Sequence, residues 1–185
     1  MTTTNGGAAW GAERRDPSVA ANEATTLRSF LDYYRDTIRI KTSGLTQAQL
    51  AIRLAPAELT LGGMIKHLAF VEVYWLVEVL AGGSVGELWA SADWEADEDW
   101  DWHSAVDDTP DELCAMFDEA VAESDRLIDE ALAREGLETR SVKKSRRQEV
   151  PFNLRWILVH LIEEYARHAG HTDLIRESID GQVGD

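Results

Sequence analysis

Apolar residues recur at spacings of three and four along four segments of the chain, which places them on one face of an α-helix. The first segment extends from about residue 22 to about 43, and the second from about 60 to about 80. The first carries one apolar stripe, made of Leu27, Phe30, Leu31, Tyr34 and Ile38. The second is apolar over most of its circumference, which predicts deep burial.

Local signals mark where the other two helices begin. Thr109, Pro110 and Glu112 form a capping box with proline in the first turn, and this helix is expected to reach about Arg134. Asn153 can cap a fourth helix that continues to about Ser178. Because no segment alternates as a strand does, four helices of roughly 20 residues each predict an all-α fold, a four-helix bundle.

The segments between these helices differ in character. Residues 1–21 lack a periodic apolar pattern, so we expect a flexible tail before a single domain over residues 22–185. From about 82 to 108, four tryptophans stand among Asp and Glu, which predicts a long, ordered, acidic loop whose indoles pack on the bundle. Five basic residues crowd into 140–147, either as a solvated connection or as an anion-attracting lip beside a pocket.

Composition narrows the function classes. The formal net charge of -16 would repel phosphate backbones, so nucleic-acid binding is not expected. No segment approaches the roughly 20 consecutive apolar residues of a membrane helix, and the first residues lack the apolar core of a secretory signal, so we expect a cytoplasmic protein with no membrane contact. Cys114, the single cysteine, cannot form an internal disulfide and is interpreted as a core residue, which leaves His and carboxylates as metal ligands.

Four titratable residues share one face of the fourth predicted helix: His160, Glu164, His168 and His171 follow one another at intervals of four, four and three. This face points toward the predicted core, where an unpartnered carboxylate is costly. Either Glu164 and His168 satisfy each other as polar core residues, or both bind a divalent cation, because side chains one turn apart can converge on one ion. In the second case, His67 on the apolar second helix is the best third ligand.

Two segments carry a resemblance to a known family. GGMIKHLAFVEVYW (62–75) and LRWILVHLIEEYARHAGHTDLIRESIDG (154–181) resemble the signature helices of the DinB/YfiT-like superfamily, and the similarity covers residues 24–181. The resemblance implies an up-down-down-up four-helix bundle that binds a divalent metal through His67, Glu164 and His168. Many members have a third His where this chain has Glu164, whereas the similar mycothiol-dependent maleylpyruvate isomerases use Glu.

The resemblance also implies an activity, since characterised members mostly act as transferases or isomerases with a low-molecular-weight thiol such as mycothiol or bacillithiol. A metal, with zinc favoured over nickel or iron, would hold the thiolate for attack on a small electrophile. His160 or His171 would move a proton or orient a ligand. Arg155 and the basic segment from Arg140 to Arg147 are candidates for binding carboxylates of the thiol or the substrate. Tyr74 and Trp75 are candidates for contacting the substrate beside His67. A homodimer is also expected.

Two other functions stay open at this point. One is a metal-binding stress-response or interaction protein whose ion is structural and does no catalysis, with the acidic loop as its contact surface. The other is a metal-dependent hydrolase that activates water. Access to the metal distinguishes the first of these from an enzyme, because a catalytic ion keeps a coordination position open.

Overall fold

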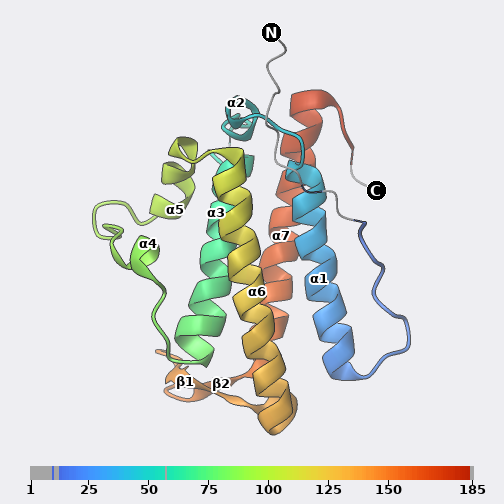
Figure 1. Ribbon diagram of the computed structural model, residues 1–185, viewed down its shortest axis with the longest axis vertical. Coiled ribbons are helices and arrows are strands. Elements are labelled where there is room, and N and C mark those ends of the chain that lie inside the picture. Colours follow the sequence, from blue (N-terminus) through green and yellow to red (C-terminus); the bar gives the residue numbers. More distant parts are fainter. Residues whose placement is uncertain (1–9, 11–12, 57, 184–185) are drawn as a thin grey trace.

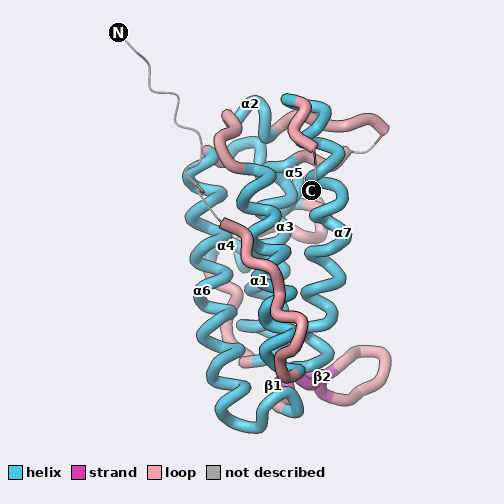
Figure 2. The backbone as a smooth tube through the Cα atoms, turned by 90° about the vertical axis from the view of Figure 1, so that its right-hand side faces the viewer, coloured by secondary structure: helices cyan, strands magenta, loops and turns pink. Residues whose placement is uncertain are grey.

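The computed structural model of the protein describes Trp10, residues 13–56 and residues 58–183. Four long helical segments lie side by side along the long axis of the molecule (Figures 1 and 2). In Figure 1, α1 and α7 run upward, whereas α3 and α6 run downward. Their bounds are α1 Glu23–Thr42, α3 Leu61–Glu72 with its continuation η1 Val73–Leu80, α6 Pro110–Glu135 and α7 Leu154–Asp180. The prediction of a mainly helical fold is confirmed.

The predicted helix starts are those of the structure. The side chain of Thr109 accepts a hydrogen bond from the backbone N–H of Glu112, whose carboxylate accepts one in return from the backbone of Thr109. Asn153 caps α7 by accepting from the backbone N–H of Trp156 at 2.9 Å. Each cap satisfies donors that a helix start leaves free.

The second long segment departs from a regular α-helix. After Glu72 it continues as the π-helix η1, Val73–Leu80, so its side chains no longer follow the 3.6-residue period that the sequence suggested. Leu76, Val79 and Leu80 stay buried, whereas Tyr74 and Trp75 are partly exposed. The π-helix thus turns two aromatic side chains toward the surface directly after the buried part of α3.

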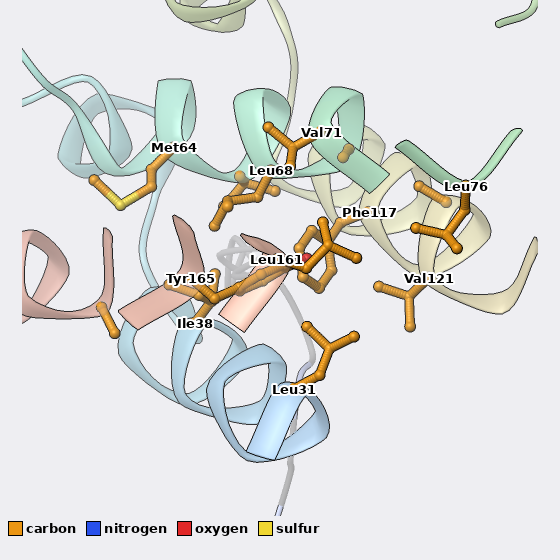
Figure 3. Close-up of a cluster of buried hydrophobic side chains, with 14 of the residues drawn as sticks. Leu31, Ile38, Met64, Leu68, Val71, Leu76, Phe117, Val121, Leu161 and Tyr165 are labelled. Carbon is orange, nitrogen blue, oxygen red and sulfur yellow. The ribbon is translucent and has the colours of Figure 1, made fainter. Parts of the chain in front are cut away.

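The core lies between the four long segments, where apolar side chains from each of them point toward one another (Figure 3). Most of the predicted stripe residues are buried, including Leu31 and Ile38 of α1 and Phe117 of α6. Phe30 is the exception: the stripe placed it on the buried face of α1, but it is 42% exposed. It lies next to Leu31 on the edge of the stripe, where the helix surface turns toward solvent.

A buried ion pair crosses the core. The guanidinium of Arg35 on α1 forms a two-pronged contact with Glu72 on α3, with nitrogen-to-oxygen distances of 2.8 Å for both prongs. Tyr165 on α7 donates to the same carboxylate at 2.8 Å, and Arg35 also reaches Asp125 on α6. Because all four long helices contribute, this network fixes the position of α3 against α7, where the candidate site lies.

The acidic loop, residues 81–108, covers the outer side of α3 in Figure 1. It contains the short helices α4 Glu87–Ala90, α5 Trp100–His103 and η2 Ser104–Asp107. Trp89 is buried, and Trp94, Trp100 and Trp102 pack against the core cluster. Lys66, itself buried on α3, ties the loop down by donating to Asp108 at 2.6 Å. The loop therefore has a fixed position against α3.

The basic segment, which the sequence left open as a solvated connection or the lip of a pocket, contains short strands that were not predicted. It forms the antiparallel pair β1 Arg140–Lys144 and β2 Pro151–Asn153, placed where α6 ends and α7 begins (Figure 1). The pairing is irregular between Arg140 and Lys144, and a strand this short shows no alternating pattern that could have revealed it. Two smaller helices complete the fold: α2 Gln47–Leu50 and η3 Gly136–Glu138.

Much of the predicted N-terminal tail, residues 1–9 and 11–12, lies outside the described residues. Trp10 packs edge-on against Phe117 at 5.6 Å between ring centroids and donates to Asp118 at 2.9 Å. Within the described part of the chain, no helix has both the length and the apolar character that crossing a membrane requires.

Candidate metal centre

The structure brings together the three residues that the sequence suggested as metal ligands. His67 comes from α3, and Glu164 and His168 come from adjacent turns of α7. One ligand atom from each residue lies within 4.8 Å of the others. His168 is 8% exposed, and the other two are partly buried. We call this set the candidate triad.

Contacts within the triad leave its donor atoms available. Nε2 of His168 lies 3.6 Å from a Glu164 oxygen, a distance too long for a good hydrogen bond. The ring centroids of His67 and His168 are 5.1 Å apart. The Glu164 carboxylate forms no hydrogen bond with any other described residue, and Nδ1 of His168 is buried with no partner among them. Two imidazoles and a carboxylate lie together here without hydrogen bonds among themselves. This arrangement is suited to binding a divalent cation.

Asp101 orients His67. Its carboxylate lies 2.7 Å from Nδ1 of His67, and its side chain is only 5% exposed. An aspartate in this position accepts a hydrogen bond from the Nδ1–H group and leaves the lone pair on Nε2, which is the arrangement of metal-bound histidines. Trp102, from the same short helix, stacks on the imidazole at 4.5 Å and restricts its rotation. The acidic loop thus supplies the support for a ligand carried by α3.

His168 is held in the neutral form that a metal ligand requires. Burial, and then the nearby His67, His171 and Arg167, lowers the pKa of His168 from 6.5 to about 4. The imidazole therefore keeps its lone pair at neutral pH without a metal ion.

His160 lies one turn before Glu164, on the other side of its carboxylate. Nε2 of His160 is 3.7 Å from Oε1 of Glu164, whereas His168 approaches Oε2. His160, Glu163 and Glu164 form a second group with ligand-like spacing, although Glu163 is exposed and paired with Arg167. His160 stacks on Trp156 at 5.1 Å and meets Trp75 edge-on at 4.7 Å. The candidate triad is the better enclosed of the two groups.

A cavity of about 180 Å³ opens beside His67. Tyr74 and Trp75, which the sequence analysis suggested as substrate-binding residues, line it together with Asp101 and Trp102. The π-helix η1 and the acidic loop form its walls. A small molecule in this cavity would contact the triad from the His67 side.

The remaining predicted residues lie in different surroundings. His171 is 5.8 Å from His168 between ring centroids, and its Nδ1 is buried with no partner in the described chain. Arg155 pairs with Glu23 and Glu138, and it does not line this cavity. Cys114 is buried in α6, where burial, followed by Asp118 and Asp111, raises the pKa of its thiol to about 12. A thiol of this kind is a poor nucleophile.

Comparison with known proteins identifies the family. A family model described as Mycothiol-S-transferase matches residues 26–181, which is most of the chain. The protein belongs to this family. The match also supports the resemblance to the DinB/YfiT-like superfamily. A search of curated proteins finds no match.

Membership in the Mycothiol-S-transferase family implies, at the level of the family, a thiol S-transferase activity related to mycothiol. A small-molecule thiol is accordingly the partner that the family suggests. The matched region contains α1 from Thr26 onward, α3, α6 and α7, and thus every residue of the candidate triad.

Proposed function

We propose that this protein is a metal-dependent thiol S-transferase that uses a low-molecular-weight thiol, mycothiol in the first place, on a small electrophile. His67, Glu164 and His168 would hold one divalent cation in an up-down-down-up bundle of DinB/YfiT type. Two histidines and one carboxylate leave a coordination position open, and this set favours zinc, with nickel or iron as alternatives. Membership in the family and the geometry of the triad support the proposal.

One observation favours a catalytic metal site over a purely structural one. His67 borders a cavity instead of being enclosed on all sides, and the cavity is lined by aromatic side chains. A structural metal site is closed by protein ligands, whereas a catalytic site keeps access for a substrate.

The chemistry divides between the ion and the protein. A bound divalent cation would supply positive charge that lowers the pKa of a thiol and favours its thiolate. Asp101 fixes the tautomer of His67, and burial keeps His168 neutral.

We propose that His160 accepts the proton of the thiol. Its Nε2 faces Glu164, and Trp75 and Trp156 hold its ring in place. His171, next to His168, would orient that ligand instead.

Metal analysis of purified variants tests the ligand set. His67→Ala, Glu164→Ala and His168→Ala should each lose most of the metal that the wild-type protein binds. His103→Ala and Glu163→Ala are the matched controls. His103 is an exposed histidine of the acidic loop, and Glu163 is the neighbour of Glu164 in the sequence. Full metal content in all three triad variants would exclude the assignment.

Activity assays separate the candidate functions. Zinc-loaded protein is incubated with monobromobimane and either mycothiol, bacillithiol or glutathione, and formation of the S-conjugate is followed by fluorescence. We expect turnover with mycothiol that disappears on chelation and in Glu164→Ala. Ester or amide hydrolysis with no thiol-dependent turnover would favour the hydrolase, and tight metal binding without azide or thiol binding would favour a structural role.

A further inference from the structure

A second pocket lies under the β-hairpin at the start of α7. Its volume is about 560 Å³, which is within the range of small-molecule sites. Arg140, Arg146 and Arg147 line it together with two aromatic residues, Phe152 of β2 and Trp156 of α7. No Asp or Glu belongs to this lining. The pocket therefore combines positive charge with aromatic surface, and we call it the basic pocket.

The charge of this pocket is unusual for the chain. The protein has 34 acidic and 18 basic residues. Elsewhere, arginine and lysine side chains are mostly neutralised by carboxylates, as in the pairs Arg39–Asp118 and Lys41–Asp173. Arg146 and Arg147 are exposed and form no ion pair with any described residue. In a protein with net charge -16, unpaired guanidinium groups gathered at one pocket favour the binding of an anion there.

The helix that borders the pocket adds to its positive potential. The pocket lining includes Asn153, the N-cap of α7, and Trp156, which lies in its first turn. The N-terminus of a helix of 27 residues carries partial positive charge. Arginine side chains and helix dipole therefore act in the same direction on a bound carboxylate or phosphate.

Aromatic rings connect the basic pocket to the candidate triad. Trp75 contacts Phe152 at 5.2 Å, Trp156 at 5.3 Å and His160 at 4.7 Å between ring centroids. Trp75 also lines the cavity beside His67. Trp156 and Glu164 are eight residues apart on α7, a rise of about 12 Å. A ligand that occupied both sites would have to be at least about this long.

We propose that the basic pocket binds the anionic group of the second substrate, an electrophile with a carboxylate or a phosphate at the end distant from its reactive carbon. The role in catalysis rests on the proposed transferase function, whereas anion binding does not. In the transfer, the thiolate sulfur forms a bond to the electrophilic carbon, the leaving group departs with the bonding electrons, and the thiol proton goes to His160. Arg146 and Arg147 hold the anion and take no part in bond making.

Direct binding tests the pocket without metal or thiol. Isothermal titration of the metal-free protein is carried out with 6-acetamidohexanoate and, separately, with inorganic phosphate. We expect at least one of them to bind, and the tighter one identifies the anion class. The variant Arg146→Gln/Arg147→Gln should weaken binding by about tenfold or more. Absence of binding of both anions at millimolar concentration would overturn the proposal.

A charge-matched variant controls for the general field of the protein. Arg15→Gln/Arg134→Gln also removes two exposed cations that form no ion pair in the described chain, and neither lines the basic pocket. Its affinity for the anion should equal that of the wild-type protein. Equal weakening by both double variants would show nonspecific electrostatics and reject a defined site.

Kinetics connect the pocket to the reaction. The zinc-loaded enzyme is assayed with mycothiol and N-iodoacetyl-6-aminohexanoate or its neutral amide. Arg146→Gln/Arg147→Gln should raise KM for the carboxylate by about tenfold and leave kcat and the amide unchanged. Equal effects on both substrates would contradict substrate binding at this pocket. If no thiol supports turnover, the transferase proposal fails, while the titrations still decide whether the pocket binds anions.

Discussion

Asp101 and His67 are joined by a hydrogen bond of 2.7 Å between the acidic loop and α3. The aspartate is buried and comes from the short helix that also places Trp102 on the same imidazole. A ligand and the group that orients it are therefore carried by different elements. Correct packing of the loop on α3 is a condition for a properly aimed His67.

This relationship predicts the effect of removing the aspartate. Asp101→Ala should lower the affinity for zinc by about 10–100-fold, because Nδ1 of His67 loses the acceptor that fixes its tautomer. Affinity is measured by competition with a chromophoric chelator. Asp97→Ala is the control, because Asp97 contacts His103 in the same loop at 2.8 Å in an exposed position. Unchanged affinity in Asp101→Ala would exclude an orienting role.

The buried pair of Arg35 and Glu72 predicts a large loss of stability when one partner is removed. Glu72→Met should lower the free energy of unfolding by about 3–5 kcal/mol, because the Arg35 guanidinium loses its fully buried partner and keeps only Asp32 and Asp125, which are both partly exposed. Urea unfolding measures the change. The double variant Arg35→Met/Glu72→Met should lose much less than the sum of the two single variants.

An exposed pair provides the comparison for this prediction. Arg126 pairs with Glu123 and Glu130 on the surface of α6, where solvent screens the charges. Arg126→Ala should leave the free energy of unfolding almost unchanged. A loss in Glu72→Met as small as that in Arg126→Ala would contradict the proposed importance of the buried network.

Cys114 should be almost unreactive in the folded protein. Its pKa of about 12, raised mainly by burial, leaves very little thiolate at pH 8. We expect iodoacetamide to alkylate the native protein at least about 100-fold more slowly than the urea-unfolded protein. Because Cys114 is the single cysteine, the mass increase of the protein measured by mass spectrometry reports its alkylation directly. Similar rates in both states would show that the thiol is accessible and ionised.

The helices were predictable from the sequence because their signals are local. Apolar spacing identified the four long segments, and Thr109 and Asn153 capped the helices that were assigned to them. The proximity of His67 to Glu164 and His168 followed from packing their apolar faces together, which the structure has. Their role as metal ligands stays a prediction.

The features that the sequence did not reveal depend on contacts between distant segments. Asp101 was one acid among many in the acidic loop, and only the path of the loop brings it to His67. Glu72 offered a weak signal, as a lone acid in the apolar segment AFVEVYW, but its partners Arg35 and Tyr165 lie on other helices. The β-hairpin pairs two segments that are too short to show a strand period.

The low pKa of His168 predicts how the stability of the metal-free protein depends on pH. The folded-state pKa of about 4 lies below the ordinary value of 6.5, so the unfolded chain takes up a proton at a pH where the folded protein does not. The contribution of this neutral imidazole is complete above about pH 6.5 and is lost as the pH falls to about 4, by roughly 3 kcal/mol. Urea unfolding in EDTA at pH 8, 6, 5 and 4.5 measures how the free energy of unfolding depends on pH.

His168→Gln should remove this part of the pH dependence, because glutamine does not titrate. His103→Gln should leave the pH dependence unchanged. Parallel curves for His168→Gln and the wild-type protein would show that His168 is not buried as a neutral group.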